Sequence, residues 1–523
     1  MENDMPNTPN NIIKSTNAAK PLKVIIIGAG IGGLASANML AKAGYDVSVY
    51  EKNSQLGGRA GRRTSKGFTF DTGPSWYLMP EVFDQYFSLF NIDVKKELSI
   101  KKLTPAYKVF FESSNPITIQ GNLTEDAKQF EAIEPGAGKK LETYVKEGGE
   151  IYQMALKHFL YTNFSDPRDL VNKEVLQQTG RMAKLLLTTI HSRVETFVTA
   201  KPLQQILEYP MVFLGTSPFK APAMYSLMSA LDFKEGVFYP AGGIYSIIEL
   251  TASIGKKLGV QYHLNADVQS IAHENGKAIG IKVSGKLIPA DIVISNADLH
   301  YTETKLLSTS AQSYPESSWN SKEPGISALL LYIGVKGSLP QLQHHNLFFV
   351  DNWKQNFIDI YQNQTIPSSA SLYVSRTTAT DAATAPKGHE NIFVLVPLPA
   401  GISLNKKQQD MLTDRFMAQI AKAIKEPDLM KKVVTIEAFG PNDFTDTFNA
   451  WKGTALGMSH ILKQSAMFRQ PNKSKKLKNL YYVGASTVPG IGLPMCLISA
   501  QLVYKRIVGI KRGGPVQSVT APS

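Results

Sequence analysis

Apolar and polar positions near the start of the chain follow two different periods. Leu22 to Ile27 form a short β-branched run, which predicts a buried strand of a parallel sheet. Leu34 to Ala43 are typical of a helix that ends at Gly44, and the stretch DVSVYE (residues 46–51) predicts a second strand. A strand, a helix and a strand in this order indicate an α/β fold.

The turn between the first strand and the helix carries three glycines, Gly28, Gly30 and Gly33, in the spacing G-x-G-x-x-G. The first allows a sharp turn, the second lets the backbone approach a pyrophosphate, and the third lets the helix pack on the strand. Glu51 ends the second strand, where an acid binds a ribose 2′-hydroxyl and disfavours a 2′-phosphate. Lys52 follows it and joins the candidate cofactor-binding residues. The sequence therefore predicts a dinucleotide-binding site here.

Patterns typical of an α/β fold occur again later in the chain. Strands are expected near Val260–Leu264, Val268–His273, Ile279–Val283, Ile292–Ser295 and Tyr481–Val483. We therefore expect a discontinuous dinucleotide-binding domain of residues 21–100, 236–300 and 471–512. A substrate domain of residues 101–235 and 301–470 would be inserted between these segments. Residues 1–20 and 513–523 are expected to form a disordered tail and a flexible tail.

One stretch of the predicted substrate domain, GRMAKLLLTTIHSRVETFV (residues 180–198), predicts an amphipathic helix with a basic approach and an apolar stripe. A helix that faces the protein core is the simpler interpretation. A helix that dips into a membrane surface is the alternative.

A second glycine-rich stretch, VGASTVPGIGLPMC (residues 483–496), is uncharged and apolar. Gly484, Gly490 and Gly492 would let the backbone approach a ligand closely, and a helix is expected to begin between Leu493 and Met495. A tight loop between a strand and the last helix, without a ligand, is the alternative interpretation.

Composition narrows the classes of protein. The chain has 523 residues, too many for one ordinary core, and its 43% hydrophobic and 19% charged residues are ordinary for a globular protein. Its single cysteine, Cys496, rules out an intramolecular disulfide and any multi-cysteine metal site. The adjacent His344 and His345 are expected to point to opposite faces of a strand, so we predict no metal site.

The formal net charge of +13 suggests attraction to a polyanion. No nucleic-acid-binding signature accompanies the lysines, so we expect no nucleic-acid partner. No apolar run reaches the roughly 18 residues that span a bilayer, and the polar N-terminal residues lack the apolar segment of a signal peptide. We expect a cytoplasmic protein that associates peripherally with the anionic inner face of a membrane. The modest lysine cluster is interpreted as a solvated loop: Lys473, Lys475, Lys476 and Lys478.

Several stretches together resemble one family. They are VIIIGAGIGGLASANMLAKAGYDVSVYEKNSQLGGRAG, FDTGPS, GVFYPAGG, ADIVISNADLHYTETKLL and NLYYVGASTVPGIGLPMCLISAQL. From about residue 22 to 510 the chain resembles the bacterial and fungal type of phytoene desaturase, in the carotenoid desaturase branch of the flavin amine oxidase-like proteins. Gly57, Gly58 and Arg59 resemble the second signature of flavoproteins with two dinucleotide-binding domains. One position departs from the family motif, because Val488 stands where a histidine usually precedes the proline.

The resemblance implies FAD as the cofactor and a Rossmann-like FAD-binding domain interleaved with an α+β substrate domain. It places Arg59 near the flavin pyrophosphate and the backbone of Val268 at the adenine ring. Gly484 would approach the ribityl–phosphate arm, and Gly490 and Gly492 would admit the isoalloxazine ring. The helix that begins between Leu493 and Met495 would face the pyrimidine edge of that ring with its N-terminus. The implied cofactor-binding residues are Gly28, Gly30, Gly33, Glu51, Lys52, Gly58, Arg59, Val268, Gly484, Gly492 and Met495.

The implied activity is the FAD-dependent desaturation of phytoene or a related polyene lipid, by hydride transfer to the flavin and loss of a proton. Oxygen or a quinone would be the terminal electron acceptor. Related flavoenzymes remain alternatives: a carotenoid isomerase or oxygenase, a polyprenoid saturase, or an amine oxidase. A non-enzyme that escorts prenylated proteins is a further alternative, although the complete glycine motif argues against it. No catalytic base can be assigned from the sequence.

Overall fold

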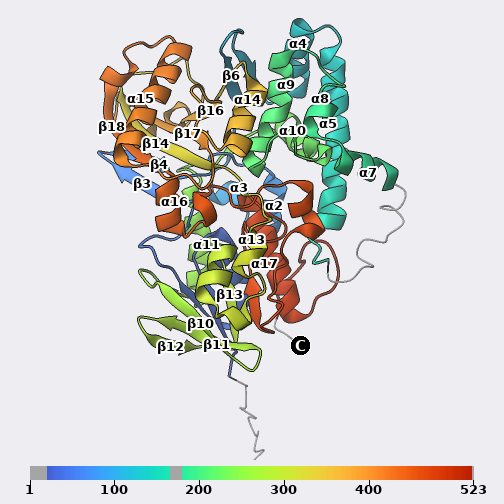
Figure 1. The fold of residues 1–523 in the computed structure, drawn as a ribbon, viewed down its shortest axis with the longest axis vertical. Helices are drawn as coiled ribbons and strands as arrows, with labels where there is room; N and C mark the ends of the chain where they lie inside the picture. The colour runs from blue at the N-terminus through green and yellow to red at the C-terminus, as the bar shows by residue number, and fades with distance from the viewer. Residues whose placement is uncertain (1–19, 165–178, 521–523) are drawn as a thin grey trace, which may run out of the picture.

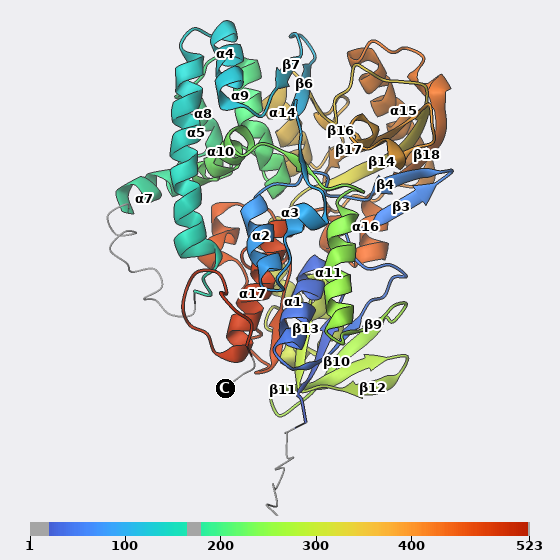
Figure 2. The same cartoon turned by 180° about the vertical axis from the view of Figure 1, so that it is seen from behind.

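The computed structural model describes residues 20–164 and 179–520, so the predicted tail at residues 1–19 and the last three residues lie outside the described chain. Two halves are stacked along the long axis of the molecule (Figure 1). The lower half is built on a five-stranded sheet, and the upper half combines a seven-stranded sheet with a group of helices. Figure 2 shows the same division from behind.

The lower sheet is parallel throughout, in the order β19-β13-β1-β2-β9. Its strands come from three distant parts of the chain, which confirms the predicted α/β class with an interleaved parallel sheet. The exact domain boundaries stay predictions. The strands are β1 (Lys23–Ile27), β2 (Asp46–Tyr50), β9 (Gln261–His263), β13 (Ile292–Ser295) and β19 (Leu480–Tyr482).

The central strand β1 is buried on both faces, as its unbroken apolar run predicts. Val24 and Ile26 pack with α1 (Ile31–Lys42), α11 (Tyr245–Lys257) and α17 (Leu493–Val508). Ile25 and Ile27 face the other way, toward a three-stranded antiparallel sheet. Successive side chains of a strand point to opposite faces, so one short run anchors both layers. The second sheet consists of β10 (Val268–Glu274), β11 (Lys277–Val283) and β12 (Lys286–Pro289).

The upper half contains the seven-stranded sheet, in the order β18-β14-β17-β16-β15-β6-β7. On β14, Leu331 and Ile333 pack against α15 (Lys406–Ala423), whereas Ala328 and Leu330 face the interior between the two halves. The strands are β6 (Tyr107–Phe111), β7 (Ile117–Ile119), β14 (Ser327–Lys336), β15 (His345–Phe349), β16 (Leu372–Arg376), β17 (His389–Leu398) and β18 (Val433–Phe439).

The remaining elements cover and connect these sheets. Two short antiparallel pairs are β3 (Arg62–Ser65) with β4 (Phe68–Asp71), and β5 (Lys101–Lys102) with β8 (Phe238–Tyr239). The other helices of the described chain are α2 (Pro80–Ser88), α3 (Val94–Glu97), α4 (Leu123–Ile133), α5 (Ala137–Met154), α7 (Thr179–Leu187), α8 (Ile190–Val194), α9 (Lys201–Glu208), α10 (Ser226–Lys234), α12 (Leu299–Tyr301), α13 (Glu316–Trp319), α14 (Trp353–Ile358) and α16 (Pro441–Phe448).

The structure differs from the sequence prediction at residues 180–198, which form two helices, α7 and α8, instead of one. The break falls at Thr188 and Thr189, because their backbone region pairs with the chain near Pro222: the Thr188 carbonyl accepts the Ala223 N–H at 2.8 Å. The Thr189 hydroxyl then caps α8 by accepting the Ser192 N–H. A tertiary contact thus overrides the local helical pattern.

The described part of the predicted flexible C-terminal tail, residues 513–520, is packed against α17. Val516 and Val519 are buried, the Val516 N–H donates to the Gln501 side chain at 2.9 Å, and the Tyr504 hydroxyl donates to the Thr520 carbonyl at 3.1 Å. Buried apolar side chains and paired backbone groups order this segment, contrary to the prediction.

A buried carboxyl group joins three elements of the upper half. Asp232 on α10 accepts hydrogen bonds from the hydroxyls of Tyr107 on β6 and Tyr209 after α9, each at 2.7 Å. Burial raises the pKa of Asp232 to about 7, and the two tyrosine hydrogen bonds oppose that rise. The carboxyl group is therefore harder to ionise in the folded protein than in the unfolded chain.

This carboxyl group predicts a specific pH dependence of stability. Because the folded pKa lies above the unfolded value, its contribution is present at about pH 4 and is lost as the pH rises through about 7. We expect the free energy of unfolding of the wild-type protein to fall between pH 5 and 8 relative to that of Asp232→Asn, in denaturant titrations. A difference between the two proteins that stays constant with pH would contradict the assignment.

Candidate functional site

The carboxyl ends of the parallel strands meet at one edge of the lower sheet. Gly28 follows β1, Glu51 follows β2, Asn296 follows β13 and Gly484 lies just beyond β19. Ligands of open α/β sheets bind in the crevice outside these strand ends, where neighbouring connections leave in opposite directions. The fold therefore brings candidate residues from three distant segments to one place.

The glycines at this edge surround the side chain of Asn296. A Cβ atom at Gly30 would lie 2.8 Å from the Asn296 amide nitrogen, and one at Gly484 would lie 2.6 Å from its amide oxygen. Gly28 has a φ of +91°, and its carbonyl accepts a hydrogen bond from Asn296 at 3.3 Å. A Cβ at Gly33 would lie 2.2 Å from the Gly28 carbonyl oxygen, so α1 packs against the turn only because Gly33 lacks a side chain.

The second glycine signature packs directly on the first. Gly57 donates its N–H to the Ala29 carbonyl at 2.9 Å and forms an isolated bridge with Gly30. A Cβ on Gly58 would lie 3.4 Å from the Cα of Gly30, and Gly58 has a φ of +57°. The two signatures therefore form one backbone surface, although 27 positions separate Gly30 from Gly57.

Glu51 is buried and holds the turn in place. One carboxylate oxygen accepts the Ala29 N–H at 2.8 Å, and the other accepts the backbone N–H and the side-chain amide of Asn53, both at 2.9 Å. A carboxylate can accept further hydrogen bonds, so a ribose hydroxyl can still be bound. Lys52 borders the same cavity, but its ammonium group donates to the Asp446 carbonyl and to Asn449 next to α16.

Arg59 lies at the inner side of the glycine surface. Its guanidinium donates to the Thr454 carbonyl at 3.3 Å, and its Nε has no hydrogen-bond partner among the described residues. Burial lowers the pKa of Arg59, whereas the negative charge of Asp298 opposes that change. A partly buried cation with an unused donor is suited to bind an anionic group such as a pyrophosphate.

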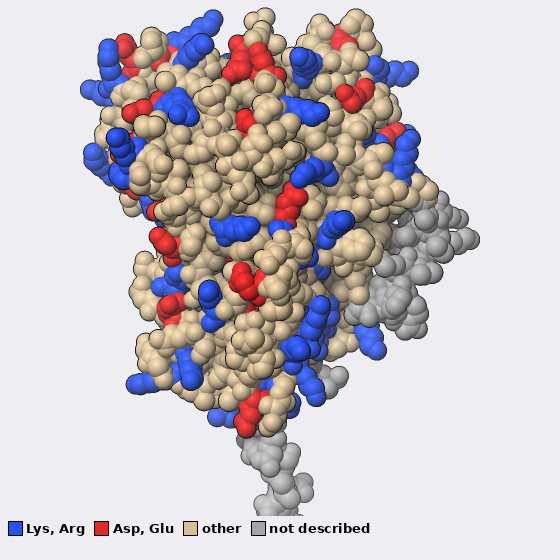
Figure 3. All heavy atoms as spheres, in the orientation of Figure 1, with Lys and Arg blue, Asp and Glu red and all other residues tan. Residues whose placement is uncertain are grey.

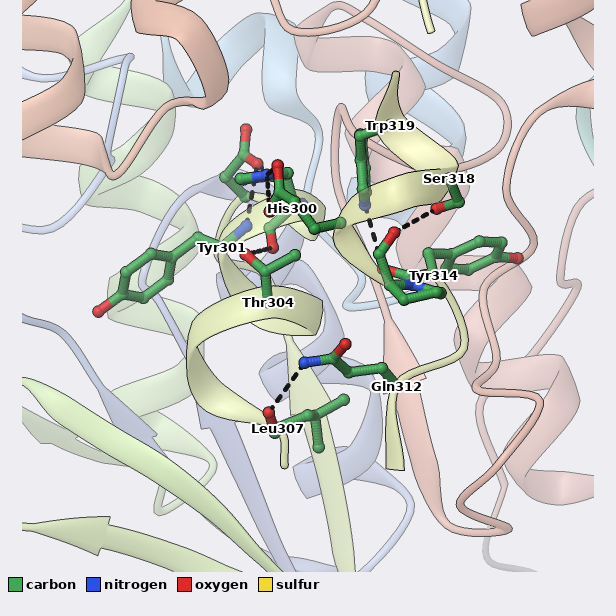
Figure 4. Close-up of polar contacts among 11 residues, drawn as sticks. His300, Tyr301, Thr304, Leu307, Gln312, Tyr314, Ser318 and Trp319 are labelled. Carbon is green, nitrogen blue, oxygen red and sulfur yellow. Dashed lines mark hydrogen bonds and ion pairs between the residues drawn. The ribbon is translucent and has the colours of Figure 1, made fainter. Parts of the chain in front are cut away.

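The far end of this edge is formed by Val268, the first residue of β10, and by the short helix α12. Asp298 caps α12 by accepting the N–H groups of His300 and Tyr301. Figure 4 shows Tyr301 pointing away from the Tyr314–Trp319 side of this cluster, and its side chain lines the cavity. Tyr301 offers an aromatic surface close to Val268, at the end where the resemblance places an adenine.

The second glycine-rich stretch forms the opposite wall of the crevice. Gly490 and Gly492 have φ values of +144° and +115°, and α17 begins directly after Gly492, as predicted. Met495 lies in the first turn of α17, where backbone N–H groups have no partner within the helix. Val488 is buried and also lines the cavity.

A single cavity of about 730 Å³ joins this crevice to the interior of the upper half. Among the described residues, the charged ones that line the cavity all lie at the crevice end: Glu51, Lys52, Arg59, Asp267 and Asp298. The interior part is a chamber whose described wall residues are uncharged, and the upper sheet contributes Ala328, Leu330, Leu347, Phe349, Tyr373 and Leu395 to it. Trp76, Tyr209 and Phe213 also line it, and the Trp76 ring packs against the rings of the other two.

These features fit FAD, the cofactor that the resemblance implies. The crevice offers a glycine surface without side chains, a buried acid and a partly buried arginine with an unused donor. The structure brings all eleven predicted binding residues to this edge of the sheet, although Lys52 is engaged by the chain near α16 and Gly33 acts through helix packing. Sequence reasoning missed Asn296 and Tyr301. A polar residue directly after the apolar strand IVIS was the available signal for Asn296.

No group of three or more histidine, cysteine, aspartate or glutamate side chains in residues 20–164 and 179–520 could hold a metal ion. His344 and His345 are both buried and are bonded to Thr380 and to the Tyr373 hydroxyl, respectively. His345 also stacks on Trp76, with ring centroids 4.5 Å apart.

Comparison with known proteins identifies the family of the chain. Residues 31–507 match the family model of the flavin containing amine oxidoreductases. The chain is 39% identical to a carotenoid 3,4-desaturase of Haloarcula japonica, over 93% of this chain and 98% of that protein. It is 33% identical to a zeta-carotene-forming phytoene desaturase of Myxococcus xanthus, over 93% and 94% of the two chains.

Among solved structures, an oxidoreductase from Methanosarcina mazei is similar in fold, with a TM-score of 0.60 at 18% identity over 92% of this chain and all of that chain. The sequence prediction of the family is thus confirmed. The chain belongs to the flavin containing amine oxidoreductases, in the branch of the carotenoid desaturases, and is an FAD-dependent oxidoreductase.

Proposed function

We propose that the protein desaturates a carotenoid polyene that lies in the chamber with one CH₂–CH₂ unit next to the flavin. The observation that carries this proposal is the single cavity shared by the glycine crevice and the apolar chamber. The five charged lining residues are confined to the crevice end. An amine substrate would meet no carboxylate among the described residues of the chamber, whereas a hydrocarbon needs none.

The chain's own residues would bind and orient the two reactants. The backbone of Gly30, Gly58 and Gly484 leaves room for the cofactor, Glu51 accepts from its ribose, and Arg59 donates to its pyrophosphate. FAD, when bound, supplies the acceptor for the hydride that leaves the polyene. The flat wall of the upper sheet would hold the polyene extended and exclude water, so recognition depends on shape and position. Oxygen or a quinone would then reoxidise the cofactor.

Two substrate classes follow from the names of the relatives, namely phytoene and a more conjugated carotenoid that is desaturated at its 3,4 bond. We expect flavin-loaded protein to convert at least one of them when phytoene or an acyclic conjugated carotene is supplied in liposomes. Each new double bond lengthens the conjugated system, so the polyene absorption should move to longer wavelength. An unchanged spectrum with both substrates would contradict the proposed function.

Replacement of Glu51 tests the proposed binding of the cofactor. We expect Glu51→Gln to bind FAD about 10- to 100-fold more weakly, because the amide offers one acceptor oxygen in place of two and loses the charge. Flavin fluorescence titration measures this affinity. Glu249→Gln is the matched control, because Glu249 is an exposed residue of α11 that pairs with Arg62. Equal affinities of the two variants would show that Glu51 does not hold the cofactor.

We also propose that the chamber opens toward a membrane. The two most exposed large apolar side chains of the described residues are Leu187 and Phe468, with exposed fractions of 78% and 58%. Leu187 ends α7, whose Met182 and Leu186 line the cavity, and Phe468 itself lines the cavity. Helix α7 projects at the edge of the molecule in both views (Figures 1 and 2). None of the described helices is long and apolar enough to cross a bilayer.

The charge of the protein adds a weaker preference for an anionic membrane surface. Figure 3 shows lysine and arginine side chains spread over the visible face among acidic ones, without one dominant patch. The net charge of +13 still favours an anionic surface, such as the inner face of a cell membrane. Apolar insertion would provide the specificity of the contact and charge would add attraction.

A vesicle experiment tests the proposed membrane contact. We expect the protein to co-sediment with anionic liposomes, more weakly at high salt, and we expect the double variant Leu187→Ser with Phe468→Ser to lose most of this binding. Met411→Ser is the control, because Met411 is similarly exposed on α15 but does not line the cavity. If the double variant and the control sediment alike, the contact lies elsewhere.

A further inference from the structure

One imidazole lines the cavity that joins the crevice and the chamber. His460 comes from the loop between α16 and β19, is buried, and is the only histidine among the cavity-lining residues of the described chain. Its Nε2 edge faces Gly490: a Cβ atom at Gly490 would lie 2.3 Å from Nε2. The absence of a side chain at Gly490 therefore leaves the space that this nitrogen occupies.

The hydrogen bond on the other side of the ring fixes its protonation pattern. His460 Nδ1 lies 3.1 Å from the Leu214 carbonyl oxygen. A carbonyl can only accept, so Nδ1 carries the hydrogen and Nε2 carries the lone pair of the neutral ring. The Tyr225 ring lies edge-on to the imidazole, with centroids 6.0 Å apart.

The surroundings keep the ring neutral. Burial lowers the pKa of His460 well below its usual value, the positive charge of Arg469 lowers it further, and the Leu214 hydrogen bond opposes these effects. Arg469 is itself buried and donates to the Ala485 and Thr487 carbonyls at 2.6 and 3.1 Å. The same arginine thus holds the glycine-rich stretch that contains Gly490 and favours the basic form of His460.

We propose that His460 Nε2 accepts the proton that the polyene loses when the new double bond forms. This proposal rests on the proposed desaturation. One C–H bond of the CH₂–CH₂ unit breaks, and its hydrogen leaves with both bonding electrons as a hydride, which FAD would accept; an allylic cation remains on the polyene. The adjacent C–H bond then breaks, its electron pair forms the new π bond, and its proton binds Nε2. The imidazolium returns this proton to solvent before the next turnover.

The chemistry suits a neutral base of low basicity. A carbocation next to a conjugated system gives up a proton readily, so a strong base is unnecessary. A carboxylate in the chamber would be costly to bury, and the acidic lining residues Glu51, Asp267 and Asp298 all lie at the crevice end. His460 is also present although the family's usual histidine is replaced by Val488, and it reaches the same glycine-rich stretch from a different part of the chain.

Two variants test the role with flavin-loaded protein and a polyene that the wild-type protein converts. Removal of a general base slows a reaction by about 10²–10⁴-fold, and we expect this loss of kcat in His460→Ala and in His460→Asn. Added imidazole should restore part of the activity of His460→Ala, and little of that of His460→Asn, whose side chain fills part of the space. His273→Ala is the matched control, because His273 lies on β10 outside the cavity.

A second readout is independent of turnover. Nitrogen NMR of the flavin-loaded protein without substrate should show the His460 ring neutral at pH 7, with the proton on Nδ1, and FAD affinity should be equal in His460→Asn and wild type. A rate for His460→Ala within about threefold of wild type would overturn the proposal, as would a ring that carries its proton on Nε2. If the wild-type protein converts no polyene, the proposed function fails, whereas an active wild type with an equally active His460→Ala refutes only the role of His460.

Discussion

The close approach of several backbone segments around the side chain of Asn296 is the constraint on which the rest of the structure depends. Gly30 and Gly484 cannot carry a side chain without meeting the Asn296 amide, and Gly33 cannot do so without meeting Gly28. These contacts join the ends of β1, β13 and β19, which come from distant parts of the chain. In the resulting surface, few side chains separate the backbone from a ligand, so that a dinucleotide can contact the backbone directly.

The second half of the molecule supplies what this surface lacks. A parallel sheet with a glycine crevice binds a polar cofactor, but it offers no room for a long hydrocarbon. The seven-stranded sheet provides this room, because successive side chains of its strands point to opposite faces. Helix α15 covers one face, and the other face, with Ala328 and Leu330, lines the chamber. The cofactor crevice and the chamber share one cavity, which is lined by residues of both halves, such as Gly30 and Leu330.

Much of the lower half could be predicted from the sequence, because its signals are local. The run before Gly28, the glycine spacing and the acid at Glu51 each act within one βαβ unit, and β13 was predicted at its observed bounds. Asn296 left only one local signal, its position directly after an apolar strand, and His460 left none. Their roles depend on which distant backbone they meet, and a single polar residue in a sequence does not show that.

Two predictions from the sequence were wrong for the same reason, namely that contacts with distant residues decide the structure. The break between α7 and α8 follows from pairing of Thr188 with the chain near Ala223, and the order of residues 513–520 follows from packing against α17. Both segments were predicted from their own composition, whereas contacts with remote residues decide their structure. The upper sheet is the clearest example of structure that local sequence patterns do not predict, because β6 and β15 pair although more than 200 positions separate them.

We propose that one cavity brings a polyene and the flavin together, so that a hydride passes from the polyene to the flavin. The sharpest experiment is an anaerobic single turnover, in which flavin absorbance and polyene absorbance are followed in the same sample. We expect one flavin to be bleached for each double bond formed, with both changes at the same rate. Polyene desaturation without bleaching of the flavin, or bleaching without a change in the polyene, would contradict it.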